Sequence, residues 1–187
     1  MLLDVLVISL IIGLLRGGKL TRLANLPLRR IELIILPFLI QYALVYFGGR
    51  GSRLLESWGV YLYIFSYSLL VVAIWYNKHI REMKILGAGI VINFIVILAN
   101  GGEMPVSVDA LSRAGLLNIL PLLKSKAYVI HTVLTESTRL KFLADVIPLP
   151  PPYPRPRVLG VGDIIMAVGL FVLIQRGMLK NHKERLA

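Results

Sequence analysis

The stretch WGVYLYIFSYSLLVVAIWY, residues 58–76, is an apolar run with aromatic side chains at both ends. A helix needs about 20 apolar residues to cross the ~30 Å hydrocarbon core of a bilayer, and aromatic residues gather at both of its interfaces. The aromatic residues at the two ends are Trp58, Tyr61, Tyr63, Trp75 and Tyr76. The pattern therefore predicts a transmembrane helix over Val60–Tyr76.

The composition of the whole chain also indicates that lipid surrounds much of the protein. Of its 187 residues 57% are hydrophobic and 17% are charged, and the mean hydropathy is +0.76. Ordinary soluble domains have roughly 45–50% apolar and roughly 25% charged residues. We therefore expect an integral membrane protein, folded as a single membrane domain over residues 1–187.

Four further apolar runs predict helices over residues 1–15, 31–48, 85–100 and 158–175. Pro37 is expected to kink the second of them, which neighbouring helices make tolerable. The expected fold class is all-α: a polytopic transmembrane bundle of about five spans.

Residues 101–157 form the longest stretch without a predicted span. Residues 116–123 are apolar but contain Pro121, which predicts a short amphipathic or re-entrant helix. Residues 127–144 are expected to form a helix with mixed faces, and the six prolines of residues 148–156 an extended, polyproline-like strap.

The basic residues predict the orientation. The net charge is +11, and twelve Lys or Arg lie in three short segments, residues 16–30, 78–84 and 176–187. The positive-inside rule then predicts a multi-pass protein of the plasma membrane with its amino terminus outside and its carboxyl terminus in the cytoplasm. Contact with anionic membrane lipids is expected. No basic face with interleaved aromatics lies outside the apolar runs, so nucleic acid is not an expected partner.

Several chemistries lack support in the sequence. The absence of cysteine excludes disulfides, thiolate catalysis and cysteine-ligated metals. The chain has no phosphate-binding glycine loop, no His-Glu-x-x-His and no Gly-x-Ser-x-Gly motif. We therefore expect no cofactor and no metal.

Asp163 is the most informative polar residue, because it lies five residues inside the last predicted helix. An ionisable group at that depth is costly and is by default a functional candidate. Gly160 and Ala167 share its face, so a neighbouring helix can approach closely. The alternative is a hydrogen bond that locks two helices together, with Asn93 or Asn100 of the fourth helix as partner.

The turn Asn100-Gly101-Gly102-Glu103-Met104-Pro105 follows the fourth predicted helix. Gly101 and Gly102 allow a sharp turn, and Pro105 fixes the direction in which the chain leaves it. Glu103 is a candidate ligand-binding residue. The alternative is a helix cap and turn without further function.

His131 and Asp145 are candidates for acid/base chemistry. The strap between Asp145 and Asp163 is able to bring these two carboxylates together, and two nearby carboxylates suit hydrolysis. The arrangement loosely resembles the lipoprotein signal peptidases, where Leu159–Asp163 would correspond to an Asn-x-Ala-Asp signature. The Gly-Asn-x-x-Asp-Arg motif of that family has no match around Asp145.

The chain is also similar to an uncharacterised family of small bacterial membrane proteins, a domain of unknown function. The resemblance rests on Asn100–Val106, His131, Leu143–Asp145 and the Gly-Asp pair at Gly162 and Asp163. Gly160 stands where the family would have a serine. The resemblance implies the architecture and supplies no activity.

Three classes of function remain open. The first is a binding or transport-related module for a small molecule or lipid headgroup at the outer face. The second is an enzyme that uses Asp163, Asp145 and His131 as acid/base groups, and the third is a scaffold for a membrane protein partner. Binding or scaffold roles rank above catalysis, because small catalytic membrane proteins usually have a denser polar motif. The candidate ligand-binding residues are Asp163, Asn100, Asn93, Glu103, His131 and Asp145.

Overall fold

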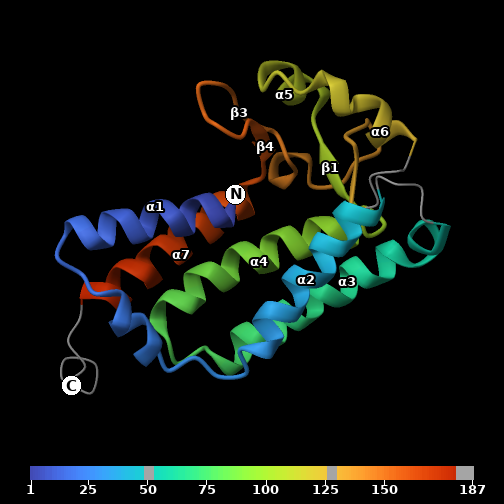
Figure 1. Ribbon diagram of the computed structural model, residues 1–187. Coiled ribbons are helices and arrows are strands. Elements are labelled where there is room, and N and C mark those ends of the chain that lie inside the picture. Colours follow the sequence, from blue (N-terminus) through green and yellow to red (C-terminus); the bar gives the residue numbers. More distant parts are fainter. Residues whose placement is uncertain (49–52, 126–129, 180–187) are drawn as a thin grey trace.

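The computed structural model describes residues 1–48, 53–125 and 130–179, and the chain is mostly helical, as expected (Figure 1). The α-helices of these residues are α1 (Leu2–Leu15), α2 (Glu32–Gly48), α3 (Arg53–Tyr76), α4 (Arg81–Ala99), α5 (Val108–Arg113), α6 (Leu120–Lys124) and α7 (Val161–Leu179).

Three helical segments are long and apolar enough to cross a membrane: Ser57–Tyr76 of α3, all of α4 and all of α7. The first two helices, α1 and α2, are apolar but shorter. Length and composition thus identify three candidate spans among the described residues, where the sequence predicted about five.

Two of the long helices begin earlier than predicted. The third helix begins at Arg53 instead of Val60, and the fourth at Arg81 instead of Ile85. The fourth gains polar residues at its start, and one of them, Glu82, accepts a 2.5 Å hydrogen bond from Arg176. Hydropathy alone does not reveal such polar turns, because they extend a helix beyond its apolar part.

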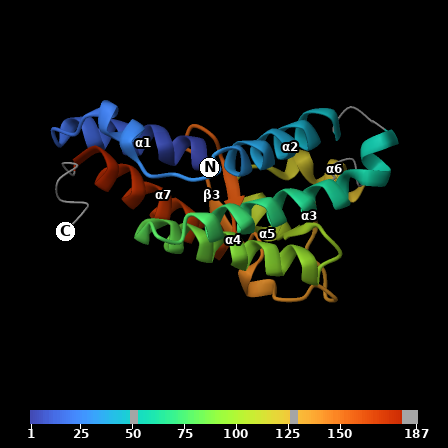
Figure 2. The same cartoon turned by 90° about the horizontal axis from the view of Figure 1, so that it is seen from below.

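The helices pack as two pairs joined through α4. Figure 2 shows α1 beside α7 and α2 beside α3, and the most extensive contact in the molecule is that of α4 with α7. Glycines permit this contact: a Cβ atom on Gly169 would lie 2.5 Å from the backbone nitrogen of Leu86. Small residues allow two helix backbones to approach closely, which is a common packing device in membranes.

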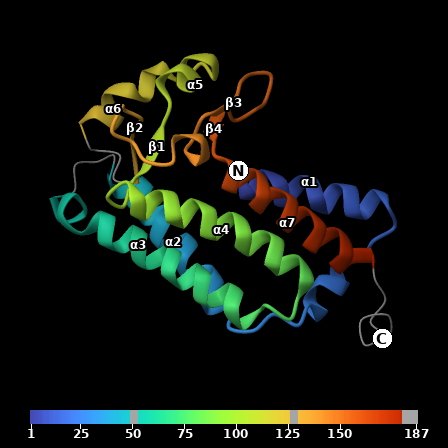
Figure 3. The ribbon, with the colours of Figure 1, turned by 180° about the vertical axis from the view of Figure 1, so that it is seen from behind.

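Residues 101–125 and 130–160 form what we call the cover layer, which lies over one end of α4 and α7 (Figures 1 and 3). It contains α5, α6, two short 3₁₀ helices and two small sheets. Strand β1 (Met104–Val106) pairs in parallel with β2 (His131–Val133), and β3 (Ile147–Leu149) pairs antiparallel with β4 (Arg157–Leu159). The 3₁₀ helices are Leu117–Ile119 and Lys141–Leu143.

The helix predicted over residues 127–144 is wrong for the part that the structure describes. Residues 131–133 are a strand and residues 141–143 a 3₁₀ helix, while residues 126–129 lie outside the described residues. Ile130, Thr132 and Val133 are β-branched, which favours extended backbone. The backbone N–H of Met104 donates to Ile130 and that of Leu134 to Val106, so the partner strand fixes this conformation.

The proline-rich strap is a hairpin and not a single extended segment. Residues 147–149 and 157–159 pair with each other, and the peptide bond between Pro151 and Pro152 is cis. Residues 116–123, predicted to be amphipathic or re-entrant, contain a 3₁₀ turn and most of α6. There Leu123 is buried against Val106 and Leu111, so this segment contributes to a core of the cover layer itself.

The basic segments meet at the opposite end of the helices, which we call the basic end. Arg22 lies in a 3₁₀ helix (Leu20–Asn25) and donates to the carbonyl oxygens of Met178 and Leu179 at the end of α7. Asn77, after α3, bonds to the backbone of Arg29. Residues 180–187, which carry the remaining basic residues of the tail, lie outside the described residues.

Candidate functional site

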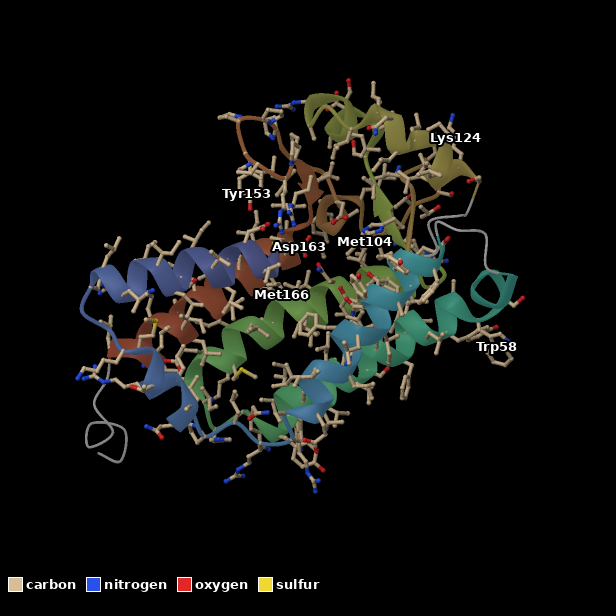
Figure 4. All side chains as sticks on the ribbon, viewed as in Figure 1. Trp58, Met104, Lys124, Tyr153, Asp163 and Met166 are labelled. Carbon is tan, nitrogen blue, oxygen red and sulfur yellow. The ribbon has the colours of Figure 1, made fainter. Side chains whose placement is uncertain are left out.

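Asp163 is the third residue of α7 and lies where this helix meets the cover layer (Figure 4). Its Oδ2 accepts a hydrogen bond from the backbone N–H of Gly160 at 3.1 Å, and its Oδ1 accepts one from Asn93 Nδ2 at 3.1 Å. The first bond is one half of a capping box, in which the third residue of a helix binds back to the residue before it. The expected depth of five residues is wrong, because β4 takes residues 157–159 out of the helix.

Asn93 connects Asp163 to the interior of the bundle. Only 2% of Asn93 is exposed, and its amide lies beside the Tyr67 side chain. A Cβ atom on Gly162 would collide with Asn93 Oδ1, so the two helices approach closely here only because residue 162 is glycine. Among the described residues Asn93 Oδ1 has no hydrogen-bond partner.

Asp145 reaches the same region from the cover layer. Its backbone N–H donates to Pro105, and its carbonyl oxygen accepts from Ser107, so β1 lies between Asp145 on one side and β2 on the other. The residue is 5% exposed. Its Oδ2 lies 3.6 Å from His131 Nε2, and its Oδ1 is buried without a donor from any residue that the structure describes.

The pKa values in the cover layer favour the uncharged forms. Burial raises the pKa of Asp145 well above its ordinary value, and the nearby charge of Asp163 raises it further. Burial lowers the pKa of His131 to about 4. His131 is therefore neutral at pH 7 and does not neutralise Asp145.

The charge of Arg157 acts on Asp163, but Arg157 is also paired with Asp4. Its Nη2 lies 2.8 Å from Asp4 Oδ2, and Arg155 Nη1 lies 3.2 Å from Asp4 Oδ1. These ion pairs tie the start of α1 to the β3–β4 hairpin. Burial lowers the pKa of Arg157, and the charge of Asp163 opposes this shift.

The structure thus brings four candidate residues together, which we call the acceptor cluster: Asn93, His131, Asp145 and Asp163. It does not place Asn100 with them. Asn100 ends α4, donates to the carbonyl oxygen of Arg139 at 3.0 Å and accepts from its N–H at 2.9 Å.

The turn after Asn100 has the backbone that its glycines suggest. Gly101 and Gly102 have φ values of 73° and 92°, and Gly102 is packed against Val60. Glu103 is half-buried in this turn, and Pro105 is buried in β1. The turn delivers the chain from α4 into the first strand of the cover layer.

Sequence reasoning missed the tyrosines beside the cluster. Tyr63 was interpreted as an interface residue, but it is 4% exposed, and Tyr67, one helical turn later, is 7% exposed. Their rings lie 5.2 Å apart and approach edge to face. Tyr63 and Tyr67 are four residues apart and Ser66 lies next to Tyr67, so the sequence does contain a pattern that indicates a polar helix face. The other aromatics of the stretch are exposed: Trp58, Tyr61, Phe65, Trp75 and Tyr76.

The described residues include no group of three or more His, Cys, Asp or Glu side chains that would hold a metal ion. The acceptor cluster instead offers two buried oxygens without donors, two carboxylates and one neutral imidazole. Such a set accepts hydrogen bonds from a ligand or exchanges protons with one.

The molecule is therefore a mostly helical protein with three helices apolar enough for a membrane and a polar cluster beneath a small cover layer. Residues 25–175 match a family of unknown function, DUF5317, and the chain belongs to this family. An uncharacterised protein of Thermotoga maritima is 30% identical over 172 residues, which cover 92% of this chain and 89% of that protein. No solved structure matches the chain.

Proposed function

We propose that this chain is a multi-pass protein of the plasma membrane in which α1, α2, α3, α4 and α7 all cross the bilayer. The two shorter helices support this, because α1 packs on α7 and α2 on α3, beside candidate spans of sufficient length. At ~1.5 Å per residue α1 covers about 21 Å, and Arg16 at its end is able to reach the interface with its long side chain. The basic end then faces the cytoplasm and the cover layer faces outside.

We further propose that the acceptor cluster binds a small cation that carries a primary ammonium group, either free or as a lipid headgroup. One observation carries this proposal: Asn93 Oδ1 and Asp145 Oδ1 are buried and have no hydrogen-bond donor among the described residues. Nearly all buried polar groups have a partner, and an unsatisfied one costs about 1–3 kcal/mol. A ligand with N–H donors satisfies both oxygens.

The charges favour a cation over an anion. Burial and the charge of Asp163 raise the pKa of Asp145, and an ammonium group beside the two carboxyl groups opposes both effects and favours their charged forms. His131 is neutral at pH 7 and does not repel a cation. The charge of Arg157 is shared with Asp4. Because both acceptor oxygens are enclosed, the group that reaches them has to be small, which fits an ammonium head.

Thermal unfolding of the purified protein in detergent tests this proposal. Methylammonium, ethanolamine and phosphatidylethanolamine are added in series, with tetramethylammonium as a cation that has no N–H donors. We expect saturable stabilisation by primary ammonium compounds and none by tetramethylammonium. Stabilisation by phosphatidylethanolamine alone identifies a headgroup, and stabilisation by the free amines a small molecule.

The matched variants are Asp145→Asn and Asp163→Asn, with Asp109→Asn as control. Asp109 is an exposed acid of the cover layer whose carboxylate lies 3.9 Å from Arg113. We expect the first two variants to lose the ligand response and the control to keep it. The absence of any response to primary amines in the wild type would contradict the proposal and favour a scaffold, in which the Asn93–Asp163 bond only locks α4 to α7.

A second candidate is acid/base catalysis, which the 3.6 Å distance between His131 Nε2 and Asp145 Oδ2 favours. A neutral imidazole beside a carboxyl group with a raised pKa is suited to moving a proton. An enzyme converts more than one equivalent of a bound amine into product, whereas a binding module returns it unchanged. Mass spectrometry of the recovered ligand distinguishes the two.

A further inference from the structure

A cavity of about 400 Å³ opens at the basic end, far from the acceptor cluster. Its walls come from the end of α3, the turn that follows and the segment before α2. Its lining residues are Arg29, Val72, Trp75, Tyr76, Lys78 and His79. The lining thus combines three basic side chains with two aromatic rings and contains no acid.

A buried asparagine, Asn77, holds two walls of this cavity together. Asn77 has no exposed surface, and its Oδ1 accepts the backbone N–H of Arg29 at 2.7 Å while its Nδ2 donates to the carbonyl oxygen of Arg29 at 2.8 Å. His79 Nε2 lies 2.9 Å from the carbonyl oxygen of Pro27. These bonds hold residues 27–29 against the turn after α3. They thereby fix the backbone of Arg29 next to the turn that carries Lys78.

The aromatic rings place the cavity at the level of lipid headgroups. Trp75 and Tyr76 are 67% and 44% exposed at the end of a candidate span. Lys78 Nζ lies 3.7 Å from the centre of the Trp75 ring, and the Arg30 guanidinium lies 5.9 Å from that of Tyr76. Rings of this kind anchor the ends of a span at the interface, and Lys78 is held at that level on Trp75. Arg30 is also paired with Glu32, whose Oε1 lies 3.6 Å from Arg30 Nη1, so Lys78 and Arg29 are the cations considered for the cavity.

We propose that this cavity binds the phosphate of an anionic phospholipid headgroup from the cytoplasmic leaflet. Arg29 supplies a planar guanidinium that matches two phosphate oxygens, and Lys78 supplies a point charge. Val72, one turn nearer the bilayer centre, offers an apolar wall for the glycerol and acyl part. That apolar wall favours a lipid over free phosphate, and the site is separate from the proposed ammonium site.

Native mass spectrometry and thermal unfolding in detergent test this site. Phosphatidylglycerol, phosphatidylcholine and inorganic phosphate are added separately to the full chain. We expect saturable binding and stabilisation by phosphatidylglycerol, several-fold weaker binding of phosphatidylcholine, and no stabilisation by inorganic phosphate at the same concentration. Equal responses to the two lipids, or a response to inorganic phosphate that matches phosphatidylglycerol, would overturn the proposal.

The double variant Arg29→Gln/Lys78→Gln removes the two cations, and Arg81→Gln/Lys84→Gln removes two exposed cations from the adjacent first turn of α4. We expect the first variant to bind phosphatidylglycerol about tenfold or more weakly, since the loss of one hydrogen bond to a charged group weakens binding roughly tenfold or more. The second variant is expected to bind as the wild type does. Equal losses in both variants would show general charge attraction and overturn the site. The wild-type comparison of lipids tests the proposal even where a variant does not fold.

Discussion

At the scale of single residues, the junction around Gly160 shows how closely the acceptor cluster is packed. A Cβ atom on Gly160 would lie 3.0 Å from the carbonyl oxygen of Leu143 and 3.1 Å from Asp145 Oδ1. Both neighbours are oxygens, so a methyl group and a hydroxyl group have different consequences there.

Gly160→Ala is expected to destabilise the protein by about 1–3 kcal/mol, the usual cost of overpacking. Gly160→Ser adds the same Cβ atom, but its hydroxyl is able to donate to Asp145 Oδ1 and to complete the capping box with Asp163. We therefore expect Gly160→Ser to unfold at a higher temperature than Gly160→Ala. The reverse order would mean that Asp145 Oδ1 does not need a donor.

His131 and Asp145 make opposite contributions to the pH dependence of stability. The folded state lowers the pKa of His131 to about 4, so His131 costs stability as the pH falls from about 6.5 towards about 4. The folded state raises the pKa of Asp145, so Asp145 favours the folded state more as the pH falls towards the ordinary pKa of 3.8.

Substituting these two residues is therefore expected to change the loss of stability on acidification in opposite directions. His131→Gln should lose less stability than the wild type between about pH 7 and about pH 5, and Asp145→Asn should lose more. Melting temperatures at the two pH values measure this directly. If the wild type and both variants lost the same stability on acidification, neither group would titrate as its burial requires.

At the scale of elements, the contact between α4 and α7 depends on glycines at which neighbouring atoms fill the space that a Cβ atom would take. A Cβ atom on Gly162 would collide with Asn93 Oδ1 and lie 2.7 Å from the carbonyl oxygen of Gly89. A methyl group there has to push the two helices apart.

Gly162→Ala is thus expected to destabilise the protein by about 2–3 kcal/mol, at the upper end of overpacking costs. Gly17→Ala is a useful comparison, because a Cβ atom there meets nothing within 4 Å and only the φ of +77° opposes it. Its cost is expected to be roughly 1 kcal/mol. Denaturant unfolding of both variants tests the difference, and equal losses would argue against a tight contact between α4 and α7.

The sequence predicted the long helices better than the cover layer, for a physical reason. Apolar runs such as residues 58–76 carry their own signal, whereas β1 and β2 are three-residue strands joined across 27 positions from Met104 to His131. Their stability depends on long-range pairing that a local pattern does not contain. A different pairing, that of β3 with β4, moved the start of the last helix to Val161 and brought Asp163 to its first turn.

The acceptor cluster was predictable in part. Asp163 and Asn93 were found because polar residues in apolar runs are conspicuous, and Asp145 because it begins the proline-rich segment. Asn100 shares a helix face with Asn93, but its amide is used by Arg139. The roles of Asp4 and Arg157 depend on the hairpin geometry and had no signal in the sequence.

At the scale of the whole molecule, the proposed topology is open to a clean test, because the chain contains no cysteine. Glu136→Cys lies on the exposed surface of the cover layer, and Arg81→Cys lies exposed at the basic end. In intact cells a membrane-impermeant maleimide is expected to label Glu136→Cys and to spare Arg81→Cys, and both should react after permeabilisation. The opposite pattern would invert the orientation.

An experimental structure of the protein with ethanolamine tests most directly whether a small ammonium ligand binds at the acceptor cluster. We expect density for the ammonium nitrogen within hydrogen-bond distance of Asn93 Oδ1 and Asp145 Oδ1, about 2.7–3.2 Å. Two oxygens satisfied by water or by the protein alone, with no ligand density between them, would contradict it.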